Sequence, residues 1–266
     1  IRCCYYNNAN TGNMIGFGVK VADLKKQDTF YNWDFDNVWK INSRINSGLP
    51  YLEVTGERAK TVLKGNGEED RPYLIYTEQD LLALVDDIYG NYDLSVKHFY
   101  KLMNDIELTA NFWTPIGANA SNDFRGIFDG NGHKISNLKL SNTHYQHAGL
   151  FGRITGTVKN LTVEAELDGG EITGAIAGES LGTIENCSSL GTVSTSASSG
   201  CAGGIVGCSS TDSVLICSNS FADVSAPHGR SGGITGELAN AVMQYCYATG
   251  NISGYTVGGA VGRIYN

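Results

Sequence analysis

Apolar residues framed by glycine recur as a five-residue block in the second half of the chain. The blocks are Ala148–Gly152, Gly174–Gly178, Gly203–Gly207, Gly232–Gly236 and Gly258–Gly262. Their final glycines follow one another at spacings of 26, 29, 29 and 26 residues. A repeat of this size is typical of architectures in which one supersecondary unit packs on the next. The pattern therefore predicts an all-β solenoid.

A second recurring phrase lies between the blocks and alternates apolar and polar positions. Corresponding places in four successive phrases hold Leu161, Cys187, Cys217 and Cys246. A place shared by leucine and cysteine is an interior one, because free cysteine behaves as a small buried hydrophobe. We therefore expect these four residues to form an interior ladder of reduced side chains. A disulfide between Cys201 and Cys208, which flank one block, is left open.

Polar residues also recur in columns. Asn137, Asn160 and Asn186 each precede a predicted interior residue, which favours a ladder of hydrogen-bonded amides between coils. The residue after each block forms another column, and its members are Arg153, Glu179, Cys208, Glu237 and Arg263. Opposite charges meet on adjacent coils at both ends of this column. Such pairs add little stability when exposed, but they help to fix register.

A helix is predicted over about residues 77–89. Thr77 and Asp80 resemble a capping box, and Leu81, Leu84, Val85 and Ile88 share one helical face. A single amphipathic helix in this position would cover the first coil of the solenoid. Residues 71–266 are expected to form the solenoid with this helix, 57–70 a linker, and 1–56 a terminal coil strand with an aromatic cap around Trp33 and Trp39.

Composition narrows the class of protein. The net charge is −8 and the isoelectric point about 5.1, which argues against a nucleic-acid partner. The chain has 34 glycines and four prolines, as expected for a turn-rich β protein rather than a disordered one. No run of 18 apolar residues is present, so no membrane insertion is expected. Because the chain begins at Ile1 in mid-motif, we expect it to be a piece of a longer protein.

The motifs resemble those of bacterial surface proteins that carry GLUG repeats. The resemblance rests on the turn Phe128-Asp-Gly-Asn-Gly-His133, on the block Gly203-Gly-Ile-Val-Gly207 and on the strand Gly182-Thr-Ile-Glu-Asn-Cys187. It covers about residues 71–266. It implies a right-handed parallel β-helix in a secreted or surface-anchored protein, located outside the cell or on its surface.

Candidate chemistry is sparse. The acidic residues between 168 and 237 scatter over the coils, and no H-E-x-x-H or G-x-S-x-G motif is present. Asp129 and Asn131 are weak candidates for calcium ligands. Asp and Asn also favour the backbone conformation of a glycine-rich turn, which explains their presence without a metal ion. The sequence therefore predicts no enzyme and no cofactor. The alternative is a β-helix protein that binds or processes polysaccharide.

The two ends of the chain match each other. The last block lacks its following strand, and Cys4-Tyr5 corresponds to Cys246-Tyr247. We therefore expect residues 1–21 to complete the coil after residue 266, within one molecule or between molecules. The expected contacts involve Cys4, Tyr5, Tyr6, Gly262, Ile264 and Tyr265. This favours a non-enzymatic surface module that acts as an adhesin, stalk or self-assembling filament subunit, with head-to-tail self-association and a host or cell-surface glycan or protein as possible partners.

Overall fold

The computed structural model describes residues 63–90, 97–109, 113–118, 121–141 and 145–265, together with four short strands nearer the N-terminus. The chain divides into two compact units, Ile1–Lys60 and Thr61–Asn266. In the first unit, β1 (Tyr5–Asn7) pairs in parallel with β2 (Phe17–Val19), and β3 (Trp39–Lys40) pairs antiparallel with β4 (Tyr51–Leu52). The side chains of the expected aromatic cap lie outside the described residues. Of the expected linker, residues 63–70 belong to the second unit.

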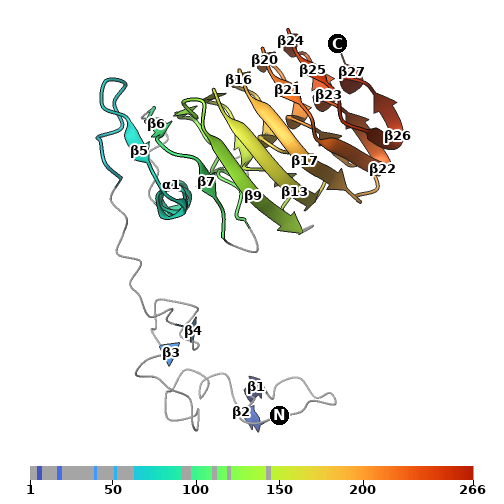
Figure 1. Cartoon of the computed structure of the whole chain (residues 1–266). Helices are drawn as coiled ribbons and strands as arrows, with labels where there is room; N and C mark the ends of the chain where they lie inside the picture. Colours follow the sequence, from blue (N-terminus) through green and yellow to red (C-terminus); the bar gives the residue numbers. More distant parts are fainter. Residues whose placement is uncertain are drawn as a thin grey trace. The chain divides into compact units, whose positions relative to one another are not determined.

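The second unit is a parallel β-solenoid (Figure 1). One of its walls is a seven-stranded sheet, and each strand in it comes from a different coil. Its strands are β5 (Tyr73–Ile75), β6 (Phe99–Leu102), β8 (Ile127–Asp129), β12 (Thr157–Lys159), β16 (Thr183–Glu185), β20 (Val214–Ile216) and β24 (Val242–Gln244). Val158, Ile184 and Leu215 stack in register along this wall and are buried.

A second wall is a five-stranded parallel sheet that contains the ends of the glycine-framed blocks. Its strands are β11 (Phe151–Ile154), β15 (Ala177–Ser180), β19 (Val206–Ser209), β23 (Thr235–Ala239) and β27 (Val261–Tyr265). Just before each strand, the middle residue of the block points into the core. Ile176, Ile205 and Ile234 are fully buried in this place.

The third sheet has eleven strands in two ladders. One ladder holds β7 (Ile106–Glu107), β9 (Lys134–Ser141), β13 (Thr162–Gly169), β17 (Ser188–Thr195), β21 (Asn219–Ser220) and β25 (Tyr247–Ala248). The other holds β10 (His147–Ala148), β14 (Ile172–Gly174) and β18 (Cys201–Gly203). The two are joined by the long strand β22 (Asp223–Gly232), which pairs with β26 (Ile252–Gly258).

One helix, α1 (Glu78–Gly90), covers the first coils (Figure 1). The Asp80 carboxylate accepts hydrogen bonds from the backbone N–H of Tyr76 at 2.9 Å and of Thr77 at 3.0 Å, which caps the helix as expected. The predicted apolar face is buried, as shown by Leu81 and Leu84 at 0% exposure. The prediction of an all-β parallel solenoid with one capping helix is therefore confirmed.

Candidate functional site

Two rows of side chains meet along the glycine-framed corner of the solenoid. The first row is the predicted column Arg153, Glu179, Cys208, Glu237 and Arg263, and the strand register confirms its order. The second row comes from the strand before each block and consists of His147, Ile172, Cys201, Arg230 and Thr256. We call the two rows together the corner strip.

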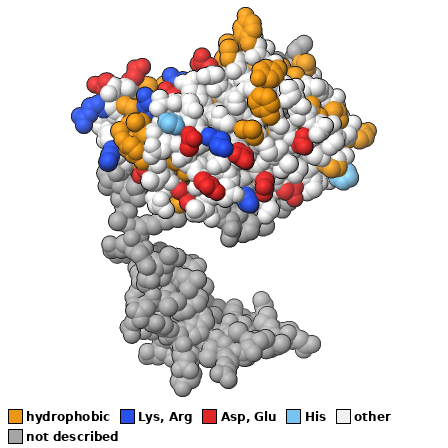
Figure 2. Space-filling view, in the orientation of Figure 1, with side chains coloured by type: hydrophobic (Ala, Val, Ile, Leu, Met, Phe, Trp, Pro, Cys, Tyr) orange, Lys and Arg blue, Asp and Glu red, His pale blue; other side chains and the backbone are white. Residues whose placement is uncertain are grey.

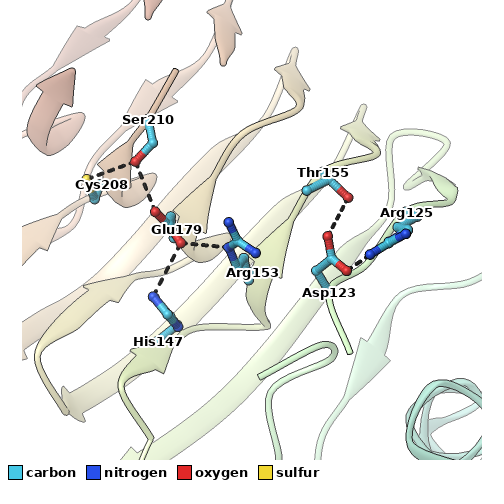
Figure 3. A network of polar contacts seen from close by, with 8 residues as sticks. All are labelled: Asp123, Arg125, His147, Arg153, Thr155, Glu179, Cys208 and Ser210. Atoms are coloured by element: carbon cyan, nitrogen blue, oxygen red, sulfur yellow. Dashed lines mark hydrogen bonds and ion pairs between the residues drawn. The ribbon is translucent and has the colours of Figure 1, made fainter. Parts of the chain in front are cut away.

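Glu179 is the centre of one half of the corner strip (Figure 3). Its Oε2 atom lies 2.8 Å from Arg153 Nε and 3.4 Å from His147 Nε2. Its Oε1 atom accepts a hydrogen bond of 3.0 Å from the Ser210 hydroxyl, which lies 3.5 Å from Cys208 Sγ. Arg153 and Glu179 are only 19% and 18% exposed. The carboxylate therefore connects three consecutive coils from a poorly solvated position.

Glu237 is the centre of the other half. Its Oε2 atom lies 3.0 Å from Arg230 Nε, which also donates to Cys201 Sγ at 3.1 Å. The Cys208 thiol donates to Oε1 of Glu237 at 4.0 Å, at the limit for a sulfur contact. The expected pairing of Glu237 with Arg263 is not the observed one, because the Arg263 guanidinium lies over the Tyr265 ring at 4.0 Å. Arg230 reaches Glu237 across the corner within the same coil.

A smaller group lies beside the strip, nearer the start of the solenoid (Figure 3). The Asp123 side chain is only 3% exposed and accepts hydrogen bonds of 2.8 Å from both Arg125 Nε and the Thr155 hydroxyl. The buried Asp123 carboxylate is thus paired with the nearby Arg125 cation and with the Thr155 hydroxyl of the next coil. This group, like the strip, holds neighbouring coils together.

The ionisable groups of the strip are poorly suited to nucleophilic or acid–base chemistry. Burial lowers the pKa of His147 below its ordinary value, against the pull of the Glu179 carboxylate, so the imidazole is neutral near pH 7. Burial raises the pKa of the Cys208 thiol to about 12 and also raises the pKa of Cys201. Thiols with raised pKa values stay protonated at neutral pH and are weak nucleophiles.

The predicted interior ladder is correct in part. Leu161 and Cys187 are buried and Cys246 is half-buried, but Cys217 is exposed, so its assignment to the interior was wrong. Cys217 instead occupies a turn at φ 52°, level with Asn186 at φ 51°. The interior place belongs to Ser218, whose hydroxyl accepts a hydrogen bond from the Cys187 backbone N–H at 3.1 Å. Cys187, Cys201, Cys208, Cys217 and Cys246 are all free, so Cys201 and Cys208 do not form a disulfide.

The amide ladder begins at Asp129 rather than at Asn137. Asn186 Nδ2 donates to Asn160 Oδ1 at 2.9 Å, and Asn160 Nδ2 donates to Asp129 Oδ1 at 2.9 Å. Asn137 lies in a bulge of β9 and donates to the Leu108 carbonyl. The same Asp129 oxygen accepts the Asn131 backbone N–H at 2.8 Å, so this candidate calcium ligand is used by the turn. Within the described ranges, no three His, Cys, Asp or Glu side chains form a group that could hold a metal ion.

A shallow groove of about 350 Å³ crosses β7, β9, β13 and β17. Three carboxylates line it, from Glu107, Glu164 and Glu166. Two of them are paired: Glu164 lies 2.9 Å from Lys134 Nζ, and Glu166 lies 3.5 Å from Lys139 Nζ. Figure 2 shows acidic side chains on this face, with a few basic side chains among them. The groove is therefore a solvated face on which two of the three carboxylates are paired with lysines.

An aromatic cluster lies on the outer face of the last two coils. The Phe221 and Tyr247 rings meet edge to face with centroids 6.1 Å apart, and the two side chains are 46% and 53% exposed. Asn219 Nδ2 donates to the Tyr247 hydroxyl at 2.9 Å, which fixes the ring. We refer to Phe221, Tyr247 and Asn219 as the aromatic platform. It combines exposed ring faces with a hydrogen-bonding edge.

Sequence reasoning missed several members of the site. Arg230, Ser210, Asp123 and His147 lie in no motif that singles them out in the sequence. The sequence signal for Arg230 is its position two residues before a block. Ile172 and Cys201 occupy the same position in the two preceding coils and are in register with it. Of the assembly candidates, Gly262, Ile264 and Tyr265 lie in β27. The side chains of Cys4, Tyr5 and Tyr6 lie outside the described residues.

No protein-family model matches the chain, so the resemblance to GLUG repeat proteins stays a prediction. The chain is 33% identical over 190 residues to "Halomucin" of Haloquadratum walsbyi, covering 66% of this chain and 2% of that protein. It is 36% identical over 136 residues to a "Putative Gly-rich membrane protein" of Evansella cellulosilytica, covering 47% of this chain and 15% of that protein. The chain thus spans a small fraction of these relatives.

A solved structure supports the fold. The crystal structure of a "putative immunoglobulin A1 protease" from Bacteroides ovatus matches with a TM-score of 0.64 and 25% sequence identity. The match covers 75% of this chain and 64% of that one. Among the described residues, no helix is both long and apolar enough to cross a membrane.

Proposed function

We propose that the chain is a non-enzymatic repeat module of an extracellular or cell-surface protein, in which it acts as a stalk, adhesin or self-assembling subunit. The observation that carries this proposal is the use of the corner strip. Its carboxylates bind arginines of the same or a neighbouring coil, as Glu179 binds Arg153 and Glu237 binds Arg230. Groups committed to ion pairs within the solenoid are not free to bind and turn over a substrate.

The relatives support a modular role. The chain matches only 2% of one relative and 15% of the other, as a repeat module within a longer protein would. One relative is named as a membrane protein, which favours a location at the cell surface. The structural neighbour is named as a protease. In our proposal the solenoid contributes binding surface or length rather than peptide-bond cleavage.

An assay for hydrolysis tests this proposal. The purified chain is incubated with immunoglobulin A1, casein and neutral or acidic polysaccharides, and new chain ends are measured. We expect no release above a blank without protein, because the strip's acids are ion-paired and its thiols have raised pKa values. Turnover that is lost in both the Glu179→Gln and Cys208→Ser variants would overturn the proposal.

Polysaccharide binding is the second candidate, and the aromatic platform favours it. Exposed aromatic faces beside an amide can stack on sugar rings and hydrogen-bond their hydroxyls. We expect the chain to be retarded in gels that contain a neutral polysaccharide. The double variant Phe221→Ala/Tyr247→Ala should lose the retardation, while Tyr255→Ala, which removes another exposed ring outside the platform, should keep it. Equal retardation of all three proteins would count against the platform.

A further inference from the structure

The outer face of the seven-stranded wall carries a row of side chains with alternating charges. Figure 1 labels β5, β6, β16 and β20 along this wall. The row takes one residue from each of six neighbouring strands, and the register places them side by side in the order Leu74, Lys101, Asp129, Lys159, Glu185 and Ile216. They alternate along their strands with buried residues such as Tyr100, Phe128 and Val158, so they point outward. We call these six residues the wall row.

The charges of the wall row are largely unpaired within the chain. Lys159 Nζ lies 3.9 Å from Asp129 Oδ2, at the limit for an ion pair. Within the described residues, neither Lys101 nor Glu185 forms an ion pair. Two lysines, one aspartate and one glutamate give the row no net charge, so it would not attract a polyanion or a polycation. What the row presents to a partner is a fixed order of signs.

The wall row is complementary to its own reverse. From β5 to β20 it reads apolar, positive, negative, positive, negative, apolar. Two such rows laid face to face in opposite directions bring opposite charges together at four places and apolar side chains together at both ends. The strand spacing of about 4.8 Å is the same in both copies, so all six places stay in register. A two-fold axis produces this reversal and requires a self-complementary surface.

A second outward row lies beside the wall row and suits the same contact. It consists of Phe99, Ile127, Thr157, Thr183 and Val214, which are in register and partly exposed. None of these residues is charged, and all but Phe99 are β-branched. In the reversed arrangement this row faces its own copy, with Ile127 opposite Thr157. Apolar contacts beside the charge pairs would exclude water and so strengthen the pairs.

We propose that the seven-stranded wall binds the same wall of a second copy of the chain, related to it by a two-fold axis parallel to the strands. The axis passes between β8 and β12, so Lys101 meets Glu185 of the second copy. By the same operation, Asp129 meets Lys159 of the second copy. The inference rests on the proposed function as a surface module, of which self-assembly is one role, and names the partner.

The size of the wall sets the strength of this contact. The six strands cover five spacings, or about 24 Å, and three residues along a strand make the wall about 10 Å wide. This is well below the area of a standard interface, about 800 Å² per partner. We therefore expect a weak, reversible dimer rather than a permanent one.

Charge reversals in the full chain test the proposal. Lys101→Glu places an acid opposite Glu185 of the second copy, and Glu185→Lys places a base opposite Lys101. Each single variant should weaken association at least about tenfold, because attraction becomes repulsion at two symmetry-related places. The double variant Lys101→Glu/Glu185→Lys restores opposite charges and should associate as the native chain does. Lys139→Glu, which reverses a 45% exposed lysine on the third sheet, is the control.

The double variant separates contact between copies from the stability of one copy. Lys101 and Glu185 lie three strand spacings apart, about 14 Å, which exceeds the screening length of about 8 Å in physiological salt. Each reversal also puts like charges on neighbouring strands, because Lys101 lies beside Asp129. Glu185 lies in the same way beside Lys159. A loss of stability would thus be greatest in the double variant, whereas the loss of association is cancelled there. Circular dichroism checks the fold of each variant.

Light scattering at concentrations up to about 1 mM gives the result, because an interface of this size is weak. The native chain and Lys139→Glu should approach the mass of two chains, while each single reversal stays nearer the mass of one. An equal mixture of the two single reversals should approach two chains, because each carries the charges that the other lacks.

Three outcomes would overturn the inference. The first is a native chain that keeps the mass of one chain up to that concentration. The second is a single reversal that associates as strongly as the native chain. The third is a double variant that associates no more strongly than the single variants. None of these results bears on the hydrolysis assay, so the proposed function is judged separately.

Discussion

Replacing Gly204 with alanine is expected to destabilise the solenoid by about 3 kcal/mol, near the upper end of the range for overpacking a well-packed interior. The new methyl group would lie 2.2 Å from the Gly233 carbonyl oxygen and 2.0 Å from Ser220 Oγ. The hydroxyl can rotate away, but the carbonyl belongs to the backbone of the next coil. The block could accommodate the methyl group only by separating two coils in the middle of the stack.

Gly259→Ala is the matched control, because Gly259 occupies the same place in the last block and its Cβ atom would meet nothing within 4 Å. We expect its free energy of unfolding to stay within about 0.5 kcal/mol of the native value. Urea denaturation in dilute solution, followed by circular dichroism, measures both variants. If the two alanines cost the same, the close approach of coils is not the reason for the glycine.

The solenoid could be predicted from the sequence because its strongest constraints are local and repeated. The glycine block recurs because each coil needs the same close approach, and Ile176, Ile205 and Ile234 recur because each coil fills the same interior place. The capping helix was also predictable, since the cap at Thr77 and the apolar face through Leu81 and Leu84 lie within one short segment. Patterns of this kind need no knowledge of the neighbouring coil.

Positions set by turn geometry were harder to predict. Cys217 follows a longer turn: Ser180 pairs with Ser209, 29 residues on, whereas Thr183 pairs with Val214, 31 residues on. The two extra residues lie between β19 and β20, where Asp212 adopts φ 67°. They move the register so that Ser218, not Cys217, faces the core. The shared residue type predicts that Cys217 belongs to the interior ladder with Cys187 and Cys246. The length of the turn instead places Ser218 in the interior.

The length of the Arg230 side chain explains why Glu237 pairs with Arg230 rather than with the predicted partner, Arg263. A column read along one strand position predicts contacts only between successive coils, as between Arg153 and Glu179. Arg230 belongs to the other row of the corner strip, and its side chain is long enough to cross the corner to Glu237. Contacts across a bend depend on the angle between two walls, which the repeat spacing does not reveal. The order of residues along the column from Arg153 to Arg263 could therefore be predicted from the sequence. The ion pair that crosses the corner could not.

The Glu179→Gln variant is expected to lose about 2 kcal/mol of folding stability, less than the loss for a fully buried ion pair because the pair is partly solvated. The amide keeps the shape of the side chain but leaves the Arg153 guanidinium, 19% exposed, without its counter-charge. Glu164→Gln is the matched control: its carboxylate is 48% exposed and pairs with Lys134, so it should cost less than about 1 kcal/mol.

The double variant Arg153→Gln/Glu179→Gln separates a lost attraction from a stranded charge. Because removing both partners leaves no uncompensated guanidinium, it should be more stable than Glu179→Gln alone. Thermal unfolding at pH 7.5 measures the three variants together with the native chain. Equal losses for Glu179→Gln and Glu164→Gln would mean that the corner strip is no more than a solvated face. A double variant less stable than the single one would mean that the Arg153 side chain stabilises the corner by packing rather than by its charge.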